Sequence, residues 1–238
     1  MNFVEALEDA ASQSNIELNS SQIEAFRYYQ ELLLVWNEKM NLTAITKPAD
    51  IAVKHIIDSL MCYDQEVFTN GCSIIDVGTG AGFPGLPLKI FCPDVQLTLL
   101  DSLNKRLVFL QEVVDKLGLK NVKIIHARAE DGARNKEFRD KYDVAVSRAV
   151  ARLNVLTELC LPFVRRGGYF VALKGAQYQE EVDGAVEAIK ILGGSIRLVN
   201  PVKLPGLDDS RAIIYINKVG PSPNNYPRRP GVPEKNPL

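Results

Sequence analysis

Residues 74–85 read IIDVGTGAGFPG, an apolar run followed by four glycines within eight positions. This pattern predicts a buried β-strand that turns tightly into a helix. Glycine accepts positive φ angles and, lacking Cβ, lets a bound molecule approach the main chain. In open α/β sheets, ligands bind outside the carboxyl ends of the strands. We therefore expect a nucleotide-like cofactor at this turn.

The rest of the chain predicts the sheet around that turn. Short β-branched runs at 73–77, 95–100, 122–125, 142–146 and 169–173 alternate with helical stretches. This alternation predicts an α/β, Rossmann-like fold with a doubly wound, mostly parallel sheet. A last strand at 212–216 is expected at an antiparallel edge.

The two ends of the chain differ from this central region. Residues 1–70 predict helices, which we interpret as an N-terminal helical cap on the α/β domain of residues 71–220. Residues 221–238 hold 6 of the 13 prolines and predict an extended, basic arm.

Composition narrows the class of protein. Hydrophobic residues make up 46% and charged residues 24%, which indicates an ordinary globular protein rather than a disordered one. The first ten residues carry three acids and no basic residue, unlike a secretory signal, and no apolar run is long enough to cross a bilayer. Four cysteines without C-x-x-C spacing and two histidines offer little for a metal site. We expect a cytoplasmic monomer without a metal.

Charge is unevenly distributed along the chain. Residues 1–70 hold 4 Lys/Arg against 11 Asp/Glu, whereas residues 71–220 hold 21 against 17 and residues 221–238 hold 3 against 1. An acidic front with a basic remainder can orient a polyanionic partner. Scattered surface charge without a target remains an equal alternative.

Two cofactor classes use such a glycine turn, and Asp76 separates them. Gly80-x-Gly82-x-x-Gly85 matches the dinucleotide pattern, which alone is a weak signal. Asp76 stands two residues before Gly78 and would repel the pyrophosphate of a dinucleotide. It would favour the ammonium and sulfonium of S-adenosylmethionine. S-adenosylmethionine is therefore the preferred cofactor over NAD.

Two further polar positions follow the next two strands. Asp101 ends the second strand, where its carboxylate can accept both ribose hydroxyls of either cofactor. Ala129 and Glu130 follow the third strand, where an adenine ring would lie. An acid that merely stabilises the start of a helix is an equally good interpretation of Glu130.

The methyl acceptor is inferred by exclusion. No Asn/Asp-Pro-Pro-Tyr/Phe segment, typical of amino-nitrogen methylation, follows the fourth strand. The nearest thiol, Cys160, lies in an apolar stretch and is better explained as a buried structural cysteine than as a nucleophile. A ring nitrogen such as guanine N7 remains, since its lone pair needs positioning more than acid–base catalysis.

Basic residues near the expected cofactor are candidates for contacts with a guanine, with phosphates or with the cofactor itself. Arg148 and Arg152 follow the fourth strand and Lys174 ends the fifth, so Arg148 and Lys174 are the candidates for positioning the acceptor. A salt-bridged basic rim is an equally good interpretation of any one of them. The arm adds three cations that can clamp phosphates, unless it is a plain disordered tail: Arg228, Arg229 and Lys235.

Taken together, motifs along the whole length make the chain resemble the RsmG (GidB) family, the bacterial 16S ribosomal RNA guanine-N7 methyltransferases. The motifs are Trp36-Asn37, Asn41-Leu42-Thr43, Lys54-His55-Ile56-Ile57-Asp58-Ser59-Leu60, Asp76 to Pro84, Asp101-Ser102-x-x-Lys105-Arg106, Arg128-Ala129-Glu130, Ser147 to Ala151, Leu173-Lys174-Gly175 and Tyr226 to Pro233.

The resemblance implies a class I methyltransferase whose substrate is a guanine in 16S ribosomal RNA, free or within the small ribosomal subunit. It implies cofactor contacts at Gly78, Phe83, Ala129, Glu130 and Arg148.

Some alternatives stay open at this stage. The cap motif of Asn37, Asn41, His55 and Asp58 either faces the cleft or forms a buried hydrogen-bond cluster. An NAD-dependent oxidoreductase and a noncatalytic ribosome-binding factor are the rival functions.

Overall fold

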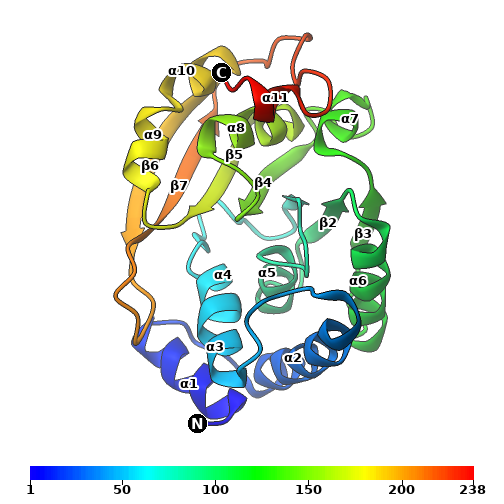
Figure 1. Cartoon of the computed structure of the whole chain (residues 1–238), viewed down its shortest axis with the longest axis vertical. Helices are drawn as coiled ribbons and strands as arrows, with labels where there is room; N and C mark the ends of the chain where they lie inside the picture. Colours follow the sequence, from blue (N-terminus) through cyan, green and yellow to red (C-terminus); the bar gives the residue numbers. More distant parts are fainter.

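One seven-stranded sheet forms the centre of the computed structural model, which describes all 238 residues (Figure 1). Its strand order is β3-β2-β1-β4-β5-β7-β6. The first five strands of that order are parallel, and β7 runs antiparallel to both neighbours. The strands are β1 (Ser73–Val77), β2 (Gln96–Asp101), β3 (Val122–His126), β4 (Tyr142–Arg148), β5 (Val164–Lys174), β6 (Gly194–Val202) and β7 (Arg211–Lys218).

Helices cover both faces of the sheet, as a doubly wound fold requires. Alternate residues of a strand face opposite ways, so Ile74 packs with the N-terminal helices and α5 and α6, while Ile75 packs with α7 to α10. None of the helices has the length and apolar character needed to cross a membrane. They are α1 (Phe3–Gln13), α2 (Ser20–Met40), α3 (Pro48–Ile51), a π-helical turn (Ala52–Ile57), α4 (Asp58–Leu60), α5 (Gly85–Phe91), α6 (Asn104–Lys116), α7 (Ala129–Arg134), α8 (Leu153–Cys160), a 3-10 turn (Leu161–Phe163), α9 (Tyr178–Asp183), α10 (Val186–Ile191) and α11 (Val232–Lys235).

The N-terminal helices pack against one face of the sheet, and their core is continuous with that of the sheet. Leu7, Phe26 and Leu33 are buried in the same cluster as Leu97 and Val144 of the central strands. Both long cap helices begin with a capping box, in which Asn2 and Asn19 accept a main-chain N–H three residues ahead. The cap and the α/β region therefore share one hydrophobic core.

The expectation of an edge strand at 212–216 was wrong in position. This strand, β7, is antiparallel as expected, but it lies between β5 and β6. The true edge is β6, whose sequence GSIRLVNPV contains Arg197, Asn200 and Pro201. Polar residues and proline are tolerated at an edge because one side of the strand needs no ladder partner, and they hide the strand from a hydrophobicity pattern.

The last residues do not form an extended arm. Residues 221–238, here called the C-terminal strap, fold back beside α7 and α8 (Figure 1). The guanidinium of Arg139 donates to the carbonyls of Ser222, Pro223 and Tyr226, which fixes the first half of the strap. Pro227 and Pro233 are buried, whereas the other four prolines of the strap are exposed.

Candidate active site

A cavity of about 530 Å³ lies at the carboxyl ends of β1, β2, β3 and β4. Its walls come from the glycine turn, the starts of α7 and α8, the cap and the strap. A volume of this size is typical of a site for a small molecule or cofactor. The side chains that line it include Thr43, His55, Gly78, Gly80, Phe83, Asp101, Arg106, Ala129, Glu130, Arg148, Val150, Gly231, Pro233 and Glu234.

The glycines of the turn serve different neighbours. Gly80 lines the cavity at φ +61°, and a Cβ on it would meet no atom closer than 4.0 Å. Gly82 does not line the cavity. A Cβ there would approach Leu86 to 2.5 Å and the Tyr29 hydroxyl to 2.6 Å, so this glycine permits packing against the cap. Only Gly78 and Gly80 of the three predicted glycines face the cavity.

Asp76 holds the turn rather than lining the cavity. Its side chain is fully buried, and Oδ2 accepts from the Thr79 hydroxyl at 2.7 Å and the Gly85 main-chain N–H at 2.9 Å. Burial raises the pKa of this carboxyl to about 6, although the two donors oppose that effect. Direct contact between Asp76 and a cofactor is therefore not what this geometry provides, because the turn lies between them.

Asp101 and Glu130 lie where the sequence places them, at the ends of β2 and β3. Asp101 accepts from the main-chain N–H of Gly80 and of Leu103, both at 2.9 Å, so it braces the turn from the cavity side. Glu130 accepts from the main-chain N–H of Gly231 at 3.0 Å. Both carboxylates border the cavity, and Glu130 also joins its rim to the C-terminal strap.

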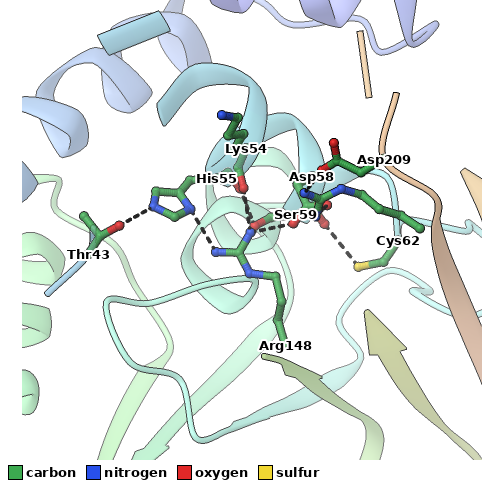
Figure 2. Close-up of polar contacts among 9 residues, drawn as sticks. Thr43, Lys54, His55, Asp58, Ser59, Cys62, Arg148 and Asp209 are labelled. Atoms are coloured by element: carbon green, nitrogen blue, oxygen red, sulfur yellow. Dashed lines mark hydrogen bonds and ion pairs between the residues drawn. The ribbon is translucent and has the colours of Figure 1, made fainter. Parts of the chain in front are cut away.

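Three side chains form a stack at the junction of the sheet and the cap. The His55 ring stacks on Phe83 with centroids 4.5 Å apart, and the Arg148 guanidinium lies 4.9 Å from the centre of the Phe83 ring. In Figure 2 the His55 imidazole lies between Thr43 and Arg148. Arg148 Nη2 donates to His55 Nδ1 at 3.2 Å, so Nε2 carries the proton and donates to the Thr43 hydroxyl oxygen at 2.8 Å.

The same cluster contains a carboxylate between two arginines. Asp58 accepts from Arg148 at 2.7 Å and from Arg211 at 3.2 Å, and its side chain is only 8% exposed. The carbonyl of Lys54 accepts a further bond from Arg148 at 3.1 Å (Figure 2). Arg148 thus donates three of its five N–H groups to the cap, two from Nη1 and one from Nη2, and presents its flat face to Phe83.

The four residues of the cap motif, Asn37, Asn41, His55 and Asp58, do not all have the same role. His55 lines the cavity, whereas Asp58 is buried beside it. Asn37 accepts from the main-chain N–H of Thr43 at 2.8 Å, and Asn41 ends α2 in the left-handed conformation. The two asparagines therefore shape the turn that carries Thr43 to the cavity.

The basic residues predicted to contact RNA differ in their freedom to do so. Lys174 is buried and bonded to Glu181 at 2.6 Å and to the Ala151 carbonyl at 2.7 Å. Arg228 holds the buried carboxylate of Glu158 with two nitrogens, 2.6–3.1 Å away. Neither side chain is free to clamp a phosphate, because each neutralises a carboxylate inside the fold. Arg152, Arg229 and Lys235 are exposed.

Neither His55 nor Cys160 is poised to act as a general base. Burial and the neighbouring Arg148 lower the pKa of His55 to about 3, so the ring is neutral near pH 7. Burial raises the pKa of the Cys160 thiol well above its usual value, as expected for a structural cysteine. The site offers hydrogen bonds, apolar faces and a fixed cation.

Sequence reasoning missed Arg211, Tyr29 and the closing role of the strap. The Tyr29 hydroxyl donates to the carbonyl of Ala81 and so ties α2 to the glycine turn. Arg211 lies far from Asp58 in the sequence, and no local pattern joins them. The motif Tyr226 to Pro233 was visible, but nothing in it indicated that Gly231 and Pro233 return to the cavity.

Comparison with known proteins assigns the chain to a family. The family model described as rRNA small subunit methyltransferase G matches residues 22–206. The chain is 48% identical over 232 residues to a Ribosomal RNA small subunit methyltransferase G of Desulforamulus reducens, covering 98% of this chain and 97% of that protein. It is 49% identical to the protein of the same name from Alkaliphilus oremlandii, with both chains covered completely.

Solved structures share the fold at low sequence identity. The TYW2 protein of M. jannaschii in complex with AdoMet superposes with a TM-score of 0.55 at 15% identity, covering 69% of this chain and 76% of that one. A 16S rRNA (adenine(1408)-N(1))-methyltransferase from Catenulisporales acidiphilia gives 0.54 at 15% identity, covering 65% and 89%. The fold is that of the class I methyltransferases, and the chain belongs to the rRNA small subunit methyltransferase G family.

Proposed function

We propose that this protein transfers a methyl group from S-adenosylmethionine to N7 of a guanine in a loop of 16S ribosomal RNA. Family membership supports methyl transfer to ribosomal RNA. The side chains at the junction of the sheet and the cap support N7 as the methylated atom. The observation that carries the choice of N7 is the neutral His55, whose two ring nitrogens are already engaged by Arg148 and Thr43.

The residues of the cavity fit S-adenosylmethionine, which when bound supplies an electrophilic methyl on a sulfonium. Gly80 leaves open space above the turn, and Gly78 lies beside it. Asp101 Oδ2 accepts from Gly80 and Arg106, whereas Oδ1 accepts only from Leu103 and keeps a lone pair for a ribose hydroxyl. Ala129 and Glu130 border the region proposed for adenine. Asp76 has one buried oxygen without a hydrogen-bond partner, so its charge acts through the turn and favours a cation above it.

A guanine N7 needs no deprotonation before it attacks. The chain then has to orient the base, exclude water and tolerate positive charge passing to the base. Phe83 offers an apolar wall, and Asp58 partly neutralises Arg148 beside it. The Nε–H and one Nη2–H of Arg148 are not used in its bonds to the cap and can donate to a base oxygen, so we propose Arg148 as a positioning residue rather than an acid.

The proposed acceptor has to leave its helix. In A-form RNA the N7 edge faces a deep, narrow groove that side chains do not read. The guanine must therefore be unstacked or flipped toward the junction. Arg152, Arg229 and Lys235 remain the exposed candidates for phosphate contacts around this entry. We further propose that the protein acts as a monomer on the rRNA or small subunit in the cytoplasm.

The test is incorporation of labelled methyl into undermethylated ribosomal RNA, followed by mapping of the modified nucleotide. A single N7-methylguanine in the small-subunit RNA is the expected product. Cofactor binding without any transfer would favour a noncatalytic ribosome-binding factor. Tight NADH binding with no binding of S-adenosylmethionine would favour an oxidoreductase.

A further inference from the structure

A second cavity, of about 310 Å³, lies on the other side of Arg148 from the first. It extends along the same sheet edge, from the end of β4 past the end of β5 to the start of β7. His55, Arg148 and Ala149 border both cavities. The two spaces are therefore neighbours that share one wall, and the second reaches away from the glycine turn.

Cations dominate the polar lining of this second cavity. Lys54, Arg148, Lys174 and Arg211 line it against one lining carboxylate, Asp58, and the charge of Lys174 is neutralised by Glu181 just outside the lining. A cavity with this charge balance attracts an anion, and planar guanidinium groups match the oxygens of a phosphate well.

Two of these cations have donor capacity to spare. The Lys54 ammonium has only a 3.5 Å contact with Asp50, a half-exposed carboxylate. Arg211 shares Asp58 with Arg148 and pairs with the half-exposed Asp209 at 3.0 Å, while its Nε has no hydrogen-bond partner. Ion pairs with exposed carboxylates are weak, so an incoming anion can replace them.

We propose that this second cavity binds a backbone phosphate of the RNA beside the target guanine, with Arg211 and Lys54 as the contacts. The proposal rests on the proposed function. A nucleotide within an RNA strand has one phosphate on its 5′ side and one on its 3′ side. A guanine held at Arg148 therefore brings the neighbouring backbone phosphates close to this edge of the sheet. The second cavity lies along this edge and provides the matching charge.

The experiment measures binding of a 16S rRNA fragment, without cofactor, over a series of salt concentrations. The test variants are Lys54→Gln, Arg211→Gln and the double variant. We expect the double variant to weaken RNA binding about tenfold and to reduce the slope of log K against log salt by about 1–2. Its affinity for S-adenosylmethionine should stay unchanged, because neither residue lines the first cavity. Arg211→Lys should restore part of the RNA affinity, since it keeps the charge.

The matched control is Arg197→Gln. Arg197 is also a strand cation, but it pairs with Glu66 at the surface and lines neither cavity. An RNA affinity and salt slope for the double variant equal to those of this control would overturn the proposal. A second result would also overturn it: inorganic phosphate binds in a way that depends on Arg211, while neither substitution changes RNA affinity. The cavity would then be a site for a free anion.

The binding readout separates this inference from the methylation reaction. Wild-type protein that binds RNA through Lys54 and Arg211 but transfers no methyl would refute the proposed function and leave the phosphate subsite standing. If the protein methylates N7 but neither substitution affects RNA binding, the proposed function stands and the phosphate subsite is refuted.

Discussion

Gly80 is the one residue of the turn whose missing side chain matters to a ligand rather than to the protein. A Cβ at Gly82 would strike the cap, and one at Gly78 would come within 2.7 Å of Val150. At Gly80 the space is empty of protein atoms. A larger side chain at Gly80 therefore blocks the ligand without clashing with the protein's own atoms.

Gly80→Val should weaken S-adenosylmethionine binding at least roughly a hundredfold, about 2.7 kcal/mol, because the branched side chain occupies the ligand's space. Equilibrium titration measures it. Gly118→Val is the matched control, since Gly118 has φ +62° and open surroundings but lies outside the cavity. Both variants carry the strain of a β-branched residue at positive φ. Equal cofactor affinities for the two would contradict the placement of the cofactor.

His55 should make folding stability depend on pH. Its pKa is about 3 in the fold and near 6.5 when unfolded, so the unfolded chain binds the proton first and stability falls as pH drops below 6.5. Between pH 7 and pH 5 the loss from this residue should be about 2 kcal/mol. The free energy of unfolding of His55→Gln, measured by urea titration, should fall by about 2 kcal/mol less than that of the wild type between pH 7 and pH 5.

Two comparisons make the His55 experiment specific. Asp76 acts in the opposite sense, since its raised pKa of about 6 means that stability decreases as pH rises toward that value, and it is present in both proteins. His126→Gln, which removes the exposed histidine, should follow the wild type. Parallel stability curves for wild type and His55→Gln would rule out a neutral, desolvated His55.

Among the elements, the C-terminal strap has the clearest measurable role. Arg228 anchors it to Glu158, whose side chain is 1% exposed. Arg228→Ala removes the guanidinium that neutralises this buried carboxylate and leaves it only the main-chain N–H of residue 228, which costs about 3 kcal/mol. We expect a lower thermal midpoint and weaker cofactor binding, because Gly231 and Pro233 would no longer be held at the cavity.

Arg229→Ala is the natural comparison for that variant, as Arg229 is the exposed neighbour in the chain. It should keep the thermal midpoint and the cofactor affinity. If Arg228→Ala lost stability yet bound the cofactor as well as Arg229→Ala does, the strap would not close the cavity.

The elements also show what a single sequence reveals. Strands β1, β2 and β4 were predictable because their central residues are buried and mostly apolar. Strands β3 and β5 were recognised from shorter stretches rich in apolar residues, 122–125 and 169–173. The edge strand β6 was not, because its Arg197 and Pro201 break that pattern. The strap was mistaken for an arm because proline content reports a lack of regular structure, not a lack of contacts.

The candidate site divides in the same way. Asp101 and Glu130 were found because strand ends converge at one sheet edge in this fold. The pairs Arg211–Asp58 and Arg228–Glu158 join residues 153 and 70 positions apart, so only the folded chain brings them together. Asp76 was predicted to favour the cationic end of the cofactor; its Oδ2 instead accepts from the Thr79 hydroxyl and the Gly85 N–H of the turn, and its effect on the cofactor stays a prediction.

At the scale of the whole molecule, the cap and the sheet should unfold together. One cluster of buried residues runs from Phe3 in α1 to Tyr215 in β7. Differential scanning calorimetry should show one transition whose calorimetric and van't Hoff enthalpies agree. Two resolved transitions, one assigned to residues 1–70, would mean that the cap is an independent domain.

Arg148 stands as the common wall of the two cavities, with its guanidinium held by His55, Lys54 and Asp58. An occupant of either space that changes how this group is held alters the free energy of filling the other. Thermodynamic reciprocity then requires that bound S-adenosylmethionine changes the affinity for RNA by the same factor by which bound RNA changes the affinity for S-adenosylmethionine.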